Sequence, residues 1–181
     1  MSAFKIQKIG HVVLRARDLE RSVRFYTEVL GFIVSDRYGA DMVPGGMVFM
    51  RCNADHHGIA LVGGARHADE KRELDHLAFA VATLDEVVLA REHLRAHGVR
   101  VVFEGRRRAG VQIAVEFLDP DDHHLEIYWG LDQLVASDRA RPSEEWRGAQ
   151  TLEAAIDNPV RGQDTTVRDP RAIAALIRPT I

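Results

Sequence analysis

The chain has 181 residues, of which 46% are hydrophobic and 28% charged, and its formal net charge is −3. This composition is typical of a globular protein with one medium domain or two small modules, and it offers no basic surplus for binding nucleic acid. No stretch approaches the ~20 apolar residues of a membrane span, the N-terminus lacks the apolar core of a signal peptide, and the one cysteine excludes an intramolecular disulfide. We therefore expect a cytoplasmic protein without a membrane partner.

The first third of the chain predicts a strand, a helix and three further strands. Asp18 is a helix N-cap, and apolar residues recur at helical spacing from there to Leu30, before Gly31. The expected strands are residues 7–14, 32–37, 47–52 and 58–63.

The same order of elements then repeats. Thr83 and Glu86 form a capping box that begins a helix extending to about residue 96, and Gly98 ends it. The expected strands of this second group are residues 74–81, 99–103, 111–118 and 124–129.

Spacing supports a duplication. His11 lies 49 residues before Ala60, and His76 lies 50 residues before Glu126. The fold class expected is therefore α+β, with two tandem βαβββ modules at residues 7–64 and 73–130 that form a single domain over residues 1–131.

Residues 132–181 depart from the repeat, and we expect a C-terminal extension with short helices packed along the modules. The segment TLEAAI is one helical candidate, and Asp169-Pro170 is a good N-cap and first-turn pair for a last helix. The basic run at residues 106–108 is interpreted mainly as a solvated loop.

Three of the four positions related by the repeat carry His11, His76 and Glu126, and the fourth is Ala60. Taken singly, a strand histidine more commonly belongs to a core or an interface, and a glutamate more commonly faces water. If the two sheets curve toward each other, the four positions meet. Two imidazoles and a carboxylate then form a facial triad with open coordination positions, which suits non-haem Fe(II).

The segments GHVVLRARDLERSVRFYTEVLGF, DHLAFAV and FLDPDDHHLEIYWG carry a resemblance to a known group. Over roughly residues 7–130 the chain resembles the vicinal oxygen chelate superfamily, which includes glyoxalase I, fosfomycin- and bleomycin-resistance proteins and extradiol dioxygenases. The resemblance implies a cupped, barrel-like mixed sheet around a metal cleft, with His11, His76 and Glu126 as ligands. The implied metal is Fe(II), with Mn(II) or another divalent ion as alternatives.

The segment FMRCNADHHGIAL is similar to the stretch of extradiol dioxygenases that holds the active-site acid/base, a role that would fall on His57. The chain also departs from that family, with Glu116 at a position that usually holds a tyrosine and Arg107 at one that usually holds a histidine. Both are expected in the substrate pocket, together with Tyr128.

Three functions follow from this resemblance. The first is ring cleavage of a catechol-like aromatic diol by dioxygen. The second is another metal-dependent reaction, catalysed by an isomerase, a lyase or a transferase, which Glu116 favours slightly. The third is a non-catalytic binding module, against which the intact set of metal ligands argues. We also expect the chain to form a homo-oligomer.

Overall fold

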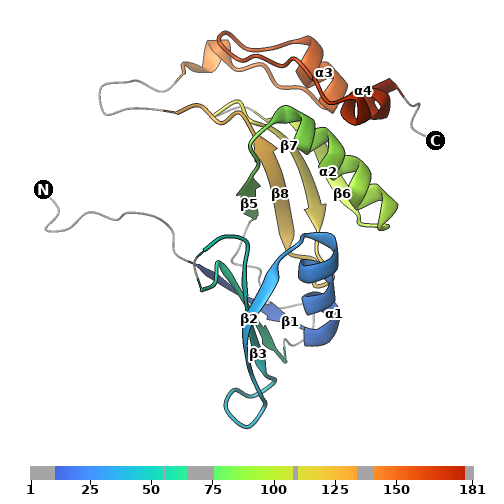
Figure 1. Cartoon of the computed structure of the whole chain (residues 1–181). Coiled ribbons are helices and arrows are strands. Elements are labelled where there is room, and N and C mark those ends of the chain that lie inside the picture. Colours follow the sequence, from blue (N-terminus) through green and yellow to red (C-terminus); the bar gives the residue numbers. More distant parts are fainter. Residues whose placement is uncertain (1–10, 55, 65–75, 108–109, 134–140, 178–181) are drawn as a thin grey trace, which may run out of the picture. The chain divides into compact units, whose positions relative to one another are not determined.

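A computed structural model describes residues 11–54, 56–64, 76–107, 110–133 and 141–177 (Figure 1). The chain divides into two compact units, Met1–Glu73 and Leu74–Ile181. Within the described residues, no helix combines the length and the apolar character needed to cross a membrane.

The first unit contains one four-stranded sheet with the order β1-β4-β3-β2. Strand β1 is parallel to β4, and the remaining pairs are antiparallel. Its elements are β1 (Val12–Ala16), α1 (Leu19–Arg24), a π-helical turn (Phe25–Val29), β2 (Ile33–Tyr38), β3 (Met47–Arg51) and β4 (Ile59–Gly63).

The first helix begins where the sequence predicts and changes form before its end. The Asp18 side chain accepts a hydrogen bond from the Arg21 amide at 3.0 Å, as an N-cap does. The last turn is wider than an α-helix, because the Leu30 amide bonds to the Phe25 carbonyl at 3.2 Å. Apolar spacing predicts the helix and its buried face, but it does not distinguish the two hydrogen-bond patterns.

The second unit repeats this plan, with the sheet order β5-β8-β7-β6 and β5 parallel to β8. The predicted capping box is confirmed, since the Glu86 amide donates to Thr83 Oγ1 and the Thr83 amide donates to Glu86 Oε2. Its elements are β5 (Leu77–Ala80), α2 (Leu84–Ala96), β6 (Val101–Arg106), β7 (Ile113–Leu118) and β8 (His124–Trp129). The predicted pair of βαβββ modules is therefore confirmed, with an open sheet in each.

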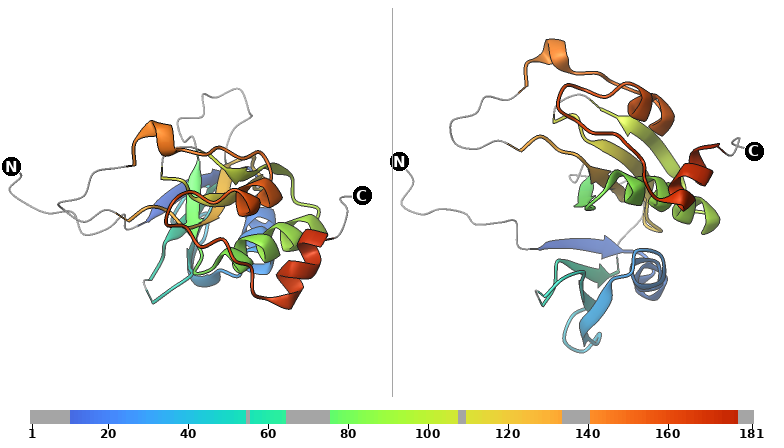
Figure 2. Two further views of the ribbon diagram at one scale, coloured as in Figure 1. Left: turned by 90° about the horizontal axis from the view of Figure 1, so that it is seen from above. Right: turned by 45° about the horizontal axis from the view of Figure 1, so that its top comes forward.

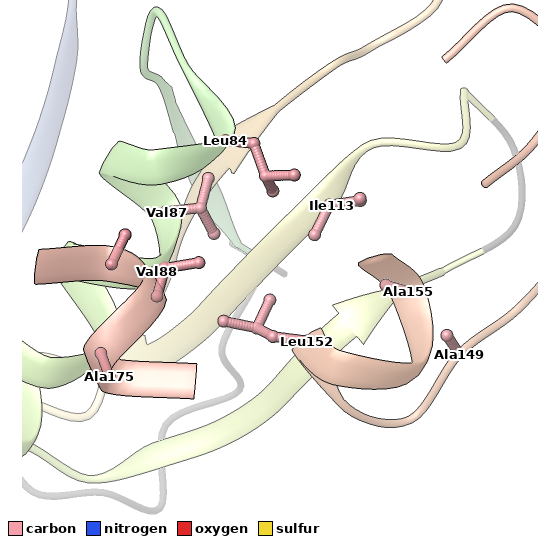
Figure 3. Close-up of a cluster of buried hydrophobic side chains, with 9 residues drawn as sticks. Leu84, Val87, Val88, Ile113, Ala149, Leu152, Ala155 and Ala175 are labelled. Carbon is pink, nitrogen blue, oxygen red and sulfur yellow. The ribbon is translucent and has the colours of Figure 1, made fainter. Parts of the chain in front are cut away.

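The C-terminal segment shares the apolar core of the second unit. A 3-10 turn (Ser143–Glu145), α3 (Leu152–Asp157) and α4 (Pro170–Ile177) follow β8, and α3 and α4 lie on the same side of the sheet as α2 (Figure 2). Small side chains let the segment approach closely. The shared cluster consists of Leu84, Val87, Val88, Ile113, Ala149, Leu152, Ala155, Ala172 and Ala175 (Figure 3). The domain boundary at residue 131 stays a prediction.

The interpretation of the basic run as a solvated loop is wrong for Arg106, whose side chain is only 1% exposed. Strand β6 continues to Arg106, and the guanidinium donates to the carbonyls of Arg147, Ala155 and Asn158 and to Gln163 Oε1. Two of these carbonyls lie at the end of α3, where helix carbonyls lack partners within the helix. Burial of Arg106 therefore joins β6 to the C-terminal segment.

Gly105 marks the same close approach. Its φ is +133°, and a Cβ at this position would lie 2.3 Å from the Ala149 carbonyl oxygen. Only glycine allows the strand and the C-terminal segment to meet at this distance.

Candidate functional site

Strand register places a row of side chains on one face of the second sheet. Ala78 on β5 pairs with Glu126 on β8, Glu126 with Glu116 on β7, and Glu116 with Phe103 on β6. Cross-strand partners point to the same side of a sheet. Ile113 on β7 packs in the core with α2, and because its parity differs from that of Glu116, the row faces away from α2.

The first sheet carries an equivalent row. Val13 pairs with Ala60, Ala60 with Phe49, and Phe49 with Asp36. His11 lies two residues before Val13, as His76 lies two residues before Ala78. The equivalence of Ala60 and Glu126, predicted from spacing, is thus present in the hydrogen-bond register.

Both histidines differ from the prediction in one respect, because they precede the strands in which we expected them. Strand β1 begins at Val12 and β5 at Leu77. In the first unit, β4 begins only at Ile59, so His11 lies beside the turn that ends at Gly58 and not beside a strand. The Gly58 carbonyl accepts a hydrogen bond from the Val12 amide. His11 therefore sits at the end of a sheet rather than within it.

Glu126 and His76 form the donor pair of the second unit. His76 Nε2 lies 3.6 Å from Glu126 Oε2, and Gln112 Nε2 donates to Glu126 Oε1 at 3.4 Å. Glu126 is only 4% exposed. Burial raises the pKa of Glu126, and the negative charge of Glu116 raises it further. The Gln112 hydrogen bond acts in the opposite direction and lowers the pKa. A bound cation would stabilise such a carboxylate.

The chemistry of this pair fits a divalent metal. An imidazole and a carboxylate within 3.6 Å of each other are common ligands of Fe(II), Mn(II) and Zn(II). The buried Gln112 Oε1 has no hydrogen-bond partner among the residues that the structure describes, which adds an unsatisfied oxygen next to Glu126. In the described part of the chain, no three His, Cys, Asp or Glu side chains gather as a metal-binding group. The set of His11, His76 and Glu126 therefore stays a prediction.

His57 lies beside His11 in the first unit. Their ring centroids are 4.5 Å apart, and the Phe49 ring lies 5.0 Å from that of His57. His57 Nδ1 is 3.0 Å from His56 Nδ1. Burial lowers the pKa of His57, and the charges of His11 and His56 lower it further, so its neutral form is favoured. A neutral imidazole accepts a proton.

Arg107 and Glu116 form a two-point ion pair. Arg107 Nε donates to Glu116 Oε1 and Nη2 to Oε2, both at 2.8 Å. His124 Nε2 lies 2.9 Å from Glu116 Oε2, close enough for a charge interaction but without the direction of a hydrogen bond. Burial raises the pKa of Glu116, but Arg107 and then His124 overcome this, so the pKa is lower than usual.

Of the remaining residues near Glu126, the sequence predicts a place in the site for some but not for others. Tyr128 pairs with Ala80 and Ala114, which places it on the face that bears Glu126, and its pocket role stays a prediction. Gln112 and Phe103 were missed by the sequence analysis. Phe103 would have followed from the register of β6 against β7, but the irregularity between Val101 and Phe103 makes that register impossible to count from sequence.

Comparison with known proteins places these features in a family. Residues 8–127 match the model of the Glyoxalase/Bleomycin resistance protein/Dioxygenase superfamily. The chain is 30% identical over 135 residues to a manganese-dependent 2,3-dihydroxybiphenyl 1,2-dioxygenase of Geobacillus genomosp. 3, covering 73% of the chain and 39% of that protein. It is 35% identical over 127 residues to a biphenyl-2,3-diol 1,2-dioxygenase of Pseudomonas sp. (strain KKS102), covering 68% of the chain and 42% of that protein.

A third relative has a more similar length. The glutathione transferase FosA of Serratia marcescens is 29% identical over 140 residues, which cover 76% of the chain and 92% of that protein. The matches to the dioxygenases span less than half of their length.

Solved structures share the fold. A glyoxylase/bleomycin resistance protein/dioxygenase domain from Frankia sp. EAN1pec aligns with a TM-score of 0.58 at 25% identity, over 70% of this chain and 99% of that one. The fosfomycin resistance protein FosX of Listeria monocytogenes aligns with a TM-score of 0.58 at 24% identity, over 70% of this chain and 95% of that one. Given its two βαβββ units and the match over residues 8–127, the chain belongs to the glyoxalase/bleomycin resistance protein/dioxygenase superfamily, the vicinal oxygen chelate proteins.

Proposed function

We propose that the protein is a metal-dependent extradiol-type dioxygenase that cleaves the ring of a catechol-like aromatic vicinal diol. The observation that carries this proposal is the 3.6 Å approach of His76 Nε2 to the buried Glu126 carboxylate. The proposed metal ligands are this pair and His11, which occupies the equivalent register in the first unit. Fe(II) is the first choice of metal, and Mn(II) is the second.

The ligand set leaves room for reactants. Three protein ligands leave coordination positions open, and Ala60 at the fourth repeat position supplies no donor atom. When bound, a divalent metal supplies positive charge that favours loss of a proton from the diol and brings the diol and dioxygen together. Gln112 holds Glu126 through its hydrogen bond to Oε1.

His57 is the proposed acid/base. A catechol binds as an anion, so a hydroxyl proton must leave and later return during ring opening. His57 contacts His11 without itself being a proposed ligand. Burial and the charges of His11 and His56 lower its pKa, which favours the neutral imidazole that accepts a proton. Arg107, Glu116 and Tyr128 are the proposed substrate-pocket residues.

The named relatives support this proposal. Two of them are dioxygenases of dihydroxybiphenyl compounds, and one is described as manganese-dependent. Other family members are described differently, including the glutathione transferase FosA. The reaction of this chain is therefore our proposal rather than a property of the family.

A second candidate is another metal-dependent reaction, of a transferase, an isomerase or a lyase. The match to FosA favours it, because that match covers 92% of the relative. Glu116 also replaces the tyrosine of the dioxygenase pattern, and it is engaged by Arg107. A binding module without chemistry would not need the buried carboxylate next to an imidazole.

Ring cleavage separates these candidates. The protein is loaded anaerobically with Fe(II) or Mn(II) and mixed with air-saturated buffer and a panel of catechols, while oxygen uptake and visible absorbance are followed. The proposal predicts uptake of one dioxygen per diol and a yellow ring-cleavage product, both absent in Glu126→Gln. Metal-loaded protein that binds a catechol but consumes no oxygen would contradict the dioxygenase and favour the second candidate.

A further inference from the structure

We infer that Arg107 is the recognition site for an anionic substituent of the substrate, so that the preferred substrate is an aromatic vicinal diol that carries a carboxylate. The diol part of this inference rests on the proposed function. The anion site itself rests on the geometry of Arg107 with Glu116 and Phe103.

The orientation of the guanidinium is fixed by two partners. Glu116 accepts from Nε and Nη2, both at 2.8 Å, and Arg107 Cζ lies 3.7 Å from the centroid of the Phe103 ring. One edge of the guanidinium is therefore used by the carboxylate, and one of its flat faces lies on an aromatic ring. An arginine held in this way loses little further freedom when it binds a ligand.

The opposite edge of Arg107 is available. A guanidinium has five N–H donors, and Glu116 uses two of them. Within the described part of the chain, Nη1 has no hydrogen-bond partner, and Nη2 keeps one further N–H. These donors form a second fork of the kind that binds both oxygens of a carboxylate.

The difference in exposure between Arg107 and Glu116 favours the binding of an anion. The Arg107 side chain is 55% exposed, whereas that of Glu116 is 6% exposed. The positive member of the pair is thus presented to a ligand and the negative member is covered. Glu116 also has His124 within 2.9 Å, so its charge is shared between two partners.

Position on the sheet indicates where the substituent lies on the substrate. Glu116 and Glu126 are cross-strand partners, and such residues stand about 5 Å apart. Arg107 is therefore close to the proposed metal ligand, at a distance that suits a carboxylate attached directly to the diol-bearing ring. Glu126 would repel an anion, but the proposed metal ion offsets its charge.

Binding to metal-loaded protein under anaerobic conditions tests this inference without turnover. Calorimetry compares 2,3-dihydroxybenzoate with its methyl ester and with catechol. Because charge-assisted hydrogen bonds are involved, we expect the acid to bind roughly 10- to 100-fold more tightly than the ester. Arg107→Met should reduce the acid-to-ester preference to within about threefold, and Glu116→Gln should weaken that preference because Arg107 is then held less firmly.

Arg168→Met is the matched control, since Arg168 also pairs with a carboxylate, Asp164, at 2.8 Å but lies at the surface near α4. It should keep the full preference for the acid. If Arg107→Met does not fold, Arg107→Lys replaces it, because lysine keeps the charge but lacks the planar fork, and it should lose most of the preference. Equal binding of acid and ester by the unchanged protein, or a full preference in the folded Arg107 variant, would overturn the inference.

The outcomes also separate this inference from the proposed function. Ring cleavage of catechol without any preference for the acid would leave the dioxygenase in place and remove the anion site. An Arg107-dependent preference for the acid without oxygen uptake would keep the anion site and remove the dioxygenase.

Discussion

Glu116 and Glu126 face each other across β7 and β8, yet their pKa values shift in opposite directions. Burial raises the pKa of both. Arg107 and His124 more than offset this at Glu116, whereas at Glu126 the Gln112 hydrogen bond and the charges of His76 and His124 do not. The negative charge of Glu116 is thus already balanced by its protein partners. Glu126 is the carboxylate that a metal ion would stabilise.

His57→Ala tests the proposed acid/base. Because the residue contacts His11 but is not a proposed ligand, the variant should keep its metal content and lose turnover by ~10²–10⁴-fold. Elemental analysis and steady-state rates measure the two effects on the same sample. Loss of metal in this variant would make His57 a ligand and the proposed ligand set wrong.

Arg106→Met tests the buried guanidinium that joins β6 to the C-terminal segment. Several backbone carbonyls would lose their donor, so we expect the free energy of unfolding to fall by roughly 2–5 kcal/mol. Chemical denaturation measures it. Arg37→Met is the control, since Arg37 forms a surface pair with Glu20 and should change stability by less than about 1 kcal/mol. Equal effects of the two substitutions would contradict this account of Arg106.

At the scale of elements, the sequence predicts helix ends correctly where they depend only on neighbouring residues. The caps at Asp18 and Thr83 and the last helix after Asp169 are where the sequence places them. The sequence does not predict the burial of a side chain whose hydrogen-bond partners lie far away along the chain. Arg106 is buried because the end of α3 accepts its hydrogen bonds, and nothing near Arg106 in the sequence indicates that.

Asp169 gives the last helix a pH dependence. Its hydrogen bonds with the Arg171 side chain and amide lower its pKa from 3.8 to about 2. A carboxyl whose pKa is lowered by folding adds stability above its ordinary pKa and loses it as the pH falls through the lowered value. We therefore expect wild type to exceed Asp169→Asn in Tm by a constant amount above about pH 5, and the difference to shrink as the pH falls below about 4. A difference that grows on acidification would contradict this assignment.

At the scale of the whole molecule, the repeat was visible in the sequence because both copies keep a histidine at the same distance from the last strand of the module. The register in each sheet agrees with that spacing. Spacing alone does not bring His11 to His76 and Glu126, because that depends on packing between modules rather than on local pattern. The functional proposal therefore depends on whether these three residues bind one metal ion.

Measurement of the metal content of ligand variants shows whether they do. Wild type, His11→Ala, His76→Ala, Glu126→Ala and a control, His97→Ala on the exposed end of α2, are loaded anaerobically with Fe(II), freed of excess metal and analysed for iron per chain. We expect about one iron per chain in wild type and the control and a loss of stoichiometric iron in each of the three ligand variants, with unchanged circular dichroism. Full iron content in folded His11→Ala, His76→Ala or Glu126→Ala would contradict it and remove that residue from the metal site.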